Sequence, residues 1–182
     1  MAIKTFTTGE VLTASDTNTY LANAGLVYVT STTVGSAVSS VTVSNCFSST
    51  YDNYRITVAG GTASVQSNIS FQLSGITGSV YYQLGYYQSS WGSSARADYA
   101  SGAVTSVIAS DGSVDGYATI LELSSPNLAK RKFGSTYSQS ANNQYSMPFQ
   151  IASTSTATGF TLTPGSGTLT GGIITVYGYR KA

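Results

Sequence analysis

The side chains that usually carry catalysis or bind metals are sparse in this chain of 182 residues. It has no histidine, so a Ser-His-Asp or Cys-His arrangement would lack its base. Cys46 is the single cysteine, which excludes an intrachain disulfide and leaves zinc without its usual thiolate and imidazole ligands. Because Cys46 stands in an alternating apolar run, we expect it to be a small buried residue. We therefore predict no catalytic, cofactor-binding or metal-binding residues.

Seven acidic residues are too few and too dispersed to indicate the paired carboxylates of a glycosidase. Asp111 and Asp115 form the closest pair, and this spacing in a loop could offer oxygen ligands to calcium. Each is followed by glycine, and Asp-Gly is a standard signal of a hairpin turn, so we interpret both as turns. A glycan depolymerase stays open as a lesser alternative, with Asp98 and Glu122 as further acids that subunit contacts could bring together.

Tyrosine and tryptophan supply the most suggestive surface chemistry. They crowd one stretch that serine and glycine interrupt: Tyr81, Tyr82, Tyr86, Tyr87, Trp91 and Tyr99. Such rings in Ser/Gly-rich loops provide rigid amphipathic contact area, which is typical of binding loops. We predict that Tyr87, Trp91 and Tyr99 are exposed and bind a sugar or a protein. The alternative is that these rings fill the core and form subunit contacts.

The low charge of the chain indicates packing into a larger particle. Charged residues make up 8% of the sequence, against roughly 25% in an ordinary soluble domain. A surface of hydroxyl groups loses little free energy when an identical neighbour covers it, whereas buried ions would be expensive. A secreted β-domain with an ordinary polar surface is the alternative. We interpret the one basic run, residues 130–132, as a solvated or subunit-edge charge cluster, and we predict no nucleic-acid partner.

The N-terminal segment carries the one convincing helix signal. A helix is predicted over residues 13–24, with Thr13 as N-cap, Asp16 as its capping-box partner and Gly25 at its end. So short and thin a helix is marginal alone, so it must dock onto something. The expected anchoring residues are Phe6, Val11, Leu12, Tyr20 and Leu21. The alternative is that this segment folds back onto its own β-body.

From Leu26 onward the hydrophobic period changes to two, which predicts short strands. The expected rows are Val38, Val41 and Val43; Tyr54, Ile56 and Val58; Ile69, Phe71 and Leu73; Val80, Tyr82, Leu84 and Tyr86; Tyr117, Thr119, Leu121 and Leu123; Tyr145, Met147, Phe149 and Ile151; and Phe160 and Leu162. Pro148 indicates an edge strand or a bulge, because proline cannot donate to a ladder. We predict an all-β fold, an antiparallel jelly-roll-like β-sandwich over residues 26–182, preceded by the short N-terminal helix in residues 1–25.

Three stretches of the chain resemble structural proteins of tailed bacteriophages. Residues 6–23, FTTGEVLTASDTNTYLAN, are similar to a leader of the form F-T-x-G-x-V-L-T-A-x-x-x-N-x-Y-L that opens small virion and fibre proteins. Residues 51–56 and 171–180 resemble the β-domains of those proteins. The resemblance implies a trimer whose leader attaches to the particle and whose β-domain faces outward, and it brings no catalytic motif.

These observations predict a non-enzymatic virion protein, a homotrimeric tail-fibre or baseplate appendage. Its partners would be other phage virion proteins, with host cell-surface glycan as a candidate ligand. A head decoration or head-fibre protein on the capsid is the alternative. No apolar run approaches the roughly 20 residues that span a bilayer, and no secretion signal is evident, so we expect no membrane partner and synthesis in the host cytoplasm. No cofactor is expected.

Overall fold

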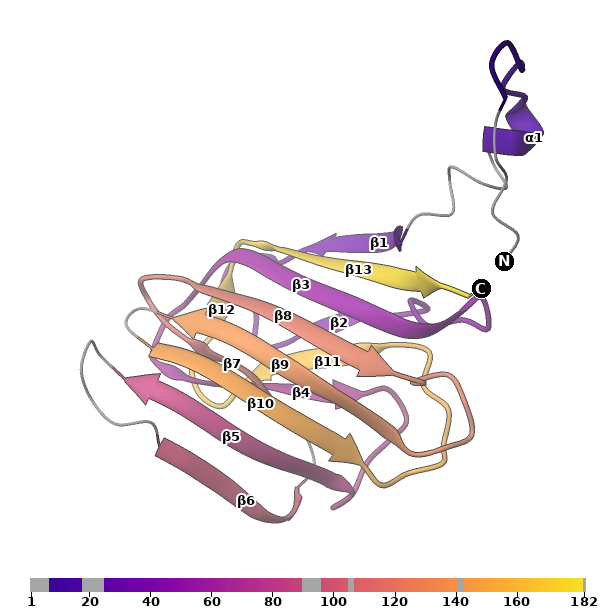
Figure 1. The fold of residues 1–182 in the computed structure, drawn as a ribbon. Coiled ribbons are helices and arrows are strands. Elements are labelled where there is room, and N and C mark those ends of the chain that lie inside the picture. The colour runs from indigo at the N-terminus through magenta and orange to yellow at the C-terminus, as the bar shows by residue number, and fades with distance from the viewer. Residues whose placement is uncertain (1–6, 18–24, 90–95, 105–106, 141–142, 182) are drawn as a thin grey trace.

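The computed structural model describes residues 7–17, 25–89, 96–104, 107–140 and 143–181, and Figure 1 shows its fold. Two antiparallel sheets pack face to face as a sandwich, with one short helix near the N-terminus. The predicted all-β sandwich with an N-terminal helix is confirmed. In the part of the chain that the structure describes, no helix is long and apolar enough to cross a membrane.

The larger sheet has nine strands in the order β1-β13-β3-β8-β9-β10-β5-β6, with β12 paired to β3 beside this path. The strands are β1 (Leu26–Thr33), β3 (Tyr51–Ala63), β5 (Tyr81–Ser89), β6 (Arg96–Val104), β8 (Tyr117–Ser124), β9 (Lys132–Ser140), β10 (Asn143–Ile151), β12 (Leu169–Thr170) and β13 (Ile173–Arg180). The smaller sheet has four strands in the order β2-β11-β4-β7. They are β2 (Val41–Val43), β4 (Ser67–Leu73), β7 (Val107–Gly112) and β11 (Phe160–Pro164). In Figure 1 the larger sheet lies in front of the smaller one.

The core lies between the two sheets and follows the alternation of the sequence. In β3, Tyr54, Ile56 and Val58 are buried while the residues between them are partly exposed, as predicted. Phenylalanines pack within and between the sheets: the Phe71 ring centroid lies 5.1 Å from that of Phe160 in the smaller sheet and 6.5 Å from that of Phe149 in the larger one. Burial of these alternate apolar side chains is the main stabilising term of such a sandwich.

Buried tyrosines also fill core volume, and backbone atoms satisfy the hydroxyl groups of Tyr54 and Tyr81. The Tyr81 hydroxyl donates to the Ile76 carbonyl at 2.9 Å and accepts from the Leu73 N–H at 3.1 Å. The row predicted for β5 is wrong, because Tyr81 is fully buried and Tyr82 lies exposed on the other face. Tyrosine suits either face of a sheet, so the alternation of this strand did not identify its inner side.

The prediction for Pro148 is also wrong. Its strand, β10, is internal to the larger sheet, between β9 and β5, and the pairing shows no change of register. The ladder to β5 instead lacks pairs at Met147 and Pro148 and resumes at Phe149 in the same register. A local gap in the ladder therefore accommodates the missing N–H of the proline.

The N-terminal helix α1 (Ala14–Asp16) begins as the sequence predicts. The Thr13 hydroxyl accepts from the Asp16 N–H at 3.1 Å, and the Asp16 carboxylate accepts from the Thr13 N–H at 3.2 Å, which completes the capping box. Residues 18–24, the rest of the predicted helix, lie outside the described residues. Gly25 has a φ of 83°, the left-handed conformation expected of a helix stop.

Candidate functional site: the outer face of the large sheet

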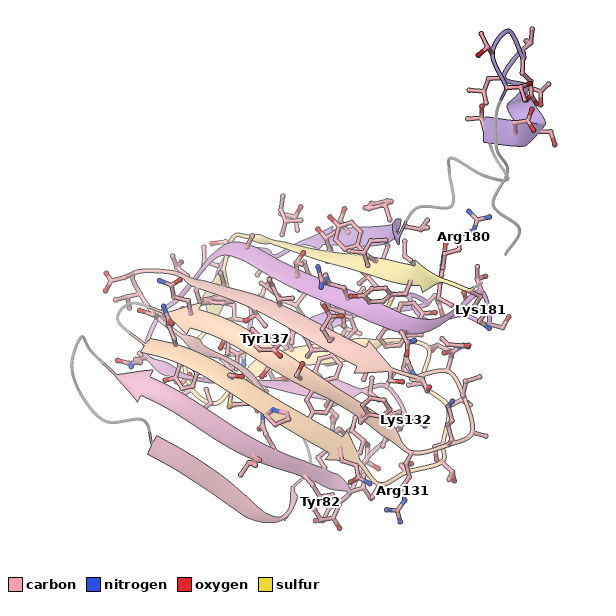
Figure 2. All side chains as sticks on the ribbon, in the orientation of Figure 1. Tyr82, Arg131, Lys132, Tyr137, Arg180 and Lys181 are labelled. Carbon is pink, nitrogen blue, oxygen red and sulfur yellow. The ribbon has the colours of Figure 1, made fainter. Side chains whose placement is uncertain are left out.

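The face of the large sheet that points away from the core carries large apolar side chains at several positions. Alternation in β8 and β9 sends every second residue outward, and Figure 2 views the molecule from this side, with Tyr137 labelled on β9. The exposed large side chains on strands of this sheet are Leu26, Tyr28, Tyr82, Ile120, Phe133, Tyr137 and Ile173. Exposed aromatic groups rimmed by polar ones mark a candidate binding surface.

Strand register places two rows of outward residues side by side. Across β3, β8 and β9, Asn53 pairs with Ser124 and Ser124 with Phe133. Two residues further along each strand, Arg55 pairs with Glu122 and Glu122 with Ser135. Because neighbouring strands lie about 4.8 Å apart, Asn53 and Phe133 flank the small Ser124 at a separation of about 10 Å.

Glu122 stands at the centre of this grid and is held at both carboxylate oxygens. Arg55 Nε donates to Oε1 at 2.5 Å, Arg55 Nη2 forms an ion pair with the same oxygen, and the Tyr179 hydroxyl donates to Oε2 at 2.8 Å. The hydrogen bond to Glu122 raises the pKa of the Arg55 guanidinium, and burial followed by the Glu122 hydrogen bond raises the pKa of Tyr179. The three side chains form one fixed polar cluster.

Tyr179 reaches this cluster where the pairing of β13 with β3 is irregular. The register shifts there because two residues of β3, Asp52 and Asn53, lie opposite the single residue Tyr179, so the β-bulge is in β3. Gly178 is required beside it, because a Cβ at that position would lie 2.3 Å from the Tyr51 ring. The Arg55 guanidinium lies 6.0 Å from the Tyr179 ring centroid, within the range of a cation–π contact.

Together with Tyr179, the two rows of outward residues on β3, β8 and β9 surround an open hollow of about 440 Å³ on the sheet. Its lining includes Asn53, Glu122, Ser124, Phe133, Ser135 and Tyr179. The hollow exists because two serines lie between larger neighbours. Its volume falls in the range of small-molecule sites, and it combines an aromatic wall with a few convergent polar groups.

A second hollow of about 630 Å³ lies at the other end of β8, where its lining includes Gly60, Gly61, Asp115, Gly116 and Tyr117. The Tyr117 hydroxyl is buried and has no hydrogen-bond partner among the described residues. The tyrosine ring takes the space of a side chain at Gly61, where a Cβ would lie 2.8 Å from it. Its lining offers no exposed aromatic wall comparable to Phe133 in the first hollow.

The predicted surface-binding tyrosines belong to the hairpin at one edge of the large sheet. Tyr87 lies in β5 opposite Tyr145 of β10 and Arg96 of β6, and Tyr99 lies in β6 opposite Leu84. The side chains of Tyr87 and Tyr99, and the whole of Trp91, lie outside the described residues. Their exposure and binding role stay a prediction.

Of the predicted anchoring residues, Val11 and Leu12 are described and are 78% and 48% exposed. Phe6, Tyr20 and Leu21 lie outside the described residues. Within residues 7–17 every residue but Asp16 is exposed, and in Figure 1 α1 stands clear of the sandwich. Two apolar side chains are thus presented to solvent just before a capped helix start.

The basic run at residues 130–132 differs from its prediction at one position. Lys130 and Arg131 are exposed, but Lys132 is fully buried at the start of β9 (Figure 2). Its ammonium group donates to the carbonyls of Leu128 at 3.0 Å, Lys130 at 2.7 Å and Ser153 at 3.2 Å. Burial lowers the pKa of Lys132. Lys132 therefore binds two loops together and is not part of a solvated charge cluster.

Two further predictions concern single residues with chemical potential. Cys46 is buried as expected, and burial raises the pKa of its thiol to about 12, so it is an unreactive core residue. Asp115 lies in a turn closed by a hydrogen bond from the Gly116 N–H to the Ser113 carbonyl at 3.2 Å. Asp111 is not in a turn, because it pairs with Asn68 inside β7.

Comparisons of the chain with protein-family models, with curated proteins and with solved structures found no match. Sequence reasoning missed the hollow, its lining residues Asn53 and Phe133, and Arg55, which binds Glu122. The available signal was weak. Arg55 and Glu122 carry opposite charges on the solvent-exposed faces of two predicted strands, but nothing in the sequence indicates that these two strands pair.

Proposed function

We propose that this chain is a non-enzymatic structural protein of a tailed-bacteriophage virion, a trimeric tail-fibre or baseplate appendage. Residues 1–25 attach it to the particle, and the β-sandwich of residues 26–182 is displayed, with a host-surface glycan as its candidate ligand. The observation that carries this proposal is the exposed apolar pair Val11 and Leu12 ahead of the capping box of Thr13 and Asp16.

An exposed apolar pair on a terminal segment is unfavourable unless a partner covers it. The capping box fixes where the helix begins, so Val11 and Leu12 enter a partner in a defined geometry. The resemblance of residues 6–23 to phage leader segments supports the same reading. A closed threefold arrangement satisfies this surface without open-ended polymerisation.

The low charge of the sandwich supports display in many identical copies. Identical neighbours cover hydroxyl-bearing surface at little desolvation cost, and threefold display strengthens weak contacts through avidity. Support for a non-enzymatic role comes from Glu122, whose two oxygens are engaged by Arg55 and Tyr179. Release of reducing ends from host polysaccharide, abolished by Glu122→Gln or Asp111→Asn, would overturn that part of the proposal.

The decisive experiment measures incorporation into virions of the phage that encodes the chain. Deletion of residues 1–24 is expected to leave a folded β-domain that is absent from purified particles. The double variant Val11→Ser with Leu12→Ser is expected to reduce incorporation at least tenfold. Val114→Ser is the matched control, because Val114 is an apolar residue in a turn of the sandwich whose exposure lies between those of Val11 and Leu12. Retained incorporation of the deletion variant would defeat the proposal.

Two further measurements complete the test. Light scattering of the purified chain should give three times its mass of 18.9 kDa, and a monomer would contradict the trimer. Immunogold labelling of intact particles locates the protein. Signal over the tail agrees with a fibre or baseplate appendage, whereas signal over the head would replace it by a capsid decoration.

A further inference from the structure

The hollow beside Phe133 is electrically neutral. The Glu122 carboxylate is engaged by Arg55 at one oxygen and by Tyr179 at the other. A cationic ligand would need a free carboxylate, and an anionic ligand would need a free guanidinium, and this pair offers neither. The charges of the site therefore favour a ligand without net charge.

Uncharged polar groups remain free at the same place. Within the described part of the chain, the Asn53 amide and the Ser135 hydroxyl make no hydrogen bond, and the Ser124 hydroxyl contacts only that of Ser125, at 3.2 Å. An amide both donates and accepts, as a hydroxyl does. The site is thus complementary to a ligand that carries several hydroxyl groups.

Phe133 supplies an apolar wall. Phe133 is 63% exposed, so a ligand that covers its ring removes apolar surface from water. The face of an aromatic ring is electron-rich and attracts polarised C–H groups. A ligand that packs on Phe133 therefore has one flat face of C–H groups. The polar side chains of Asn53, Ser124 and Ser135 require hydroxyl groups on the edge of the same ligand.

We propose that this hollow binds a pyranose sugar without net charge, with one face of the sugar ring on Phe133 and its hydroxyls on Asn53, Ser124 and Ser135. A pyranose combines an axial C–H face with equatorial hydroxyls, and a volume of about 440 Å³ admits a small ligand. The clustered polar side chains of Glu122, Arg55 and Tyr179 are fixed before binding, so little entropy is lost when the ligand enters. The inference deepens the proposed function and rests on it only for the source of the sugar.

The test uses the purified full chain and saturation-transfer NMR, which detects weak ligands. The probes are the methyl pyranosides of glucose, galactose, mannose and N-acetylglucosamine, each at about 10 mM, which is ten times a Kd of about 1 mM expected for a single subsite. A second arm uses purified bacterial surface polysaccharide. Signal in the first arm identifies a terminal or free sugar as sufficient, and signal in the second arm alone identifies a unit within a polymer.

The variants locate the binding. Phe133→Ala should weaken binding about tenfold, as expected for one aromatic contact, whereas Phe133→Tyr should keep it. Tyr137→Ala is the matched control, because Tyr137 is a half-exposed aromatic residue on the same face of β9 outside this hollow, and it should bind like the parent. Asn53→Ala should also weaken binding. Circular dichroism confirms that each variant is folded.

Two outcomes would overturn the inference: no signal in either arm, or binding that Phe133→Ala leaves unchanged. Neither depends on incorporation into virions, which the N-terminal variants test separately. If the chain failed to enter particles, binding of a pyranoside at Phe133 would still stand, and if no sugar bound, attachment through Val11 and Leu12 would be unaffected.

Discussion

The two faces of the large sheet are made by the same strands, but their alternate residues have different roles. Inward residues such as Ile56, Leu121 and Phe149 are buried against the smaller sheet and stabilise the fold. Outward residues such as Phe133 and Tyr137 remain exposed, and Arg55 and Glu122 pair among them. One face of this sheet therefore stabilises the fold, while the other is available for recognition.

The largest expected effect tests this division with one phenylalanine of the smaller sheet, in the core between the sheets, and one on the outer face of the large sheet. Phe160→Ala removes a fully buried ring that stacks near Phe47 and Phe71, and should lower the free energy of unfolding by about 3–5 kcal/mol. Phe133→Ala removes an exposed ring and should change it by less than about 0.5 kcal/mol. Urea unfolding measures both. Similar losses in the two variants would break the comparison.

A second prediction concerns Lys132, a buried charge at the start of β9. Lys132→Met removes the donor from three loop carbonyls and should lower the free energy of unfolding by about 2–3 kcal/mol. Lys130→Met is the control, because Lys130 is exposed and close in sequence, and its effect should stay within about 0.5 kcal/mol. Equal stability of the two variants would show that the buried ammonium does not hold the loops.

The third prediction uses the buried phenol of Tyr81, whose pKa burial raises from 10.0 to about 12. Above pH 10 the unfolded chain releases this proton while the folded chain keeps it, so stability should fall as the pH rises from 10 to 12. Burial lowers the pKa of Lys132, which titrates in the opposite sense, but this contribution is the same in the parent and in Tyr81→Phe and cancels in their comparison. Urea midpoints measured across the window should fall less steeply in Tyr81→Phe, and an unchanged slope would contradict the assignment.

Much of the fold could be predicted from the sequence, because a strand with one solvent-exposed face alternates strictly between apolar and polar residues. The row of Tyr54, Ile56 and Val58 and the capping box of Thr13 and Asp16 depend on neighbours in sequence, and both were predicted. The facing of β5 was not, because tyrosine suits either face. The place of Pro148 was not, because it depends on a gap in the ladder to another strand.

The candidate site was hidden for a related reason. Arg55 and Glu122 are 67 residues apart in sequence, and they meet only because β3 pairs with β8 in one particular register. Tyr179, from a third strand, joins them opposite a bulge in β3. Composition and periodicity identify which residues face outward, but they do not say which outward residues become neighbours.

The smallest expected effect on stability separates the two faces most sharply. The side chains of Arg55 and Glu122 are 37% and 28% exposed, so solvent screens their ion pair. A double-mutant cycle with Arg55→Met and Glu122→Gln should therefore give a coupling free energy of less than about 1 kcal/mol. The coupling should shrink further in high salt. The two single variants should also weaken pyranoside binding, because each removes one side chain of the Arg55–Glu122 pair, which holds the polar groups of the hollow in place. A coupling of several kcal/mol with unchanged binding would mean that this pair belongs to the fold, as Phe160 does, and not to a recognition surface.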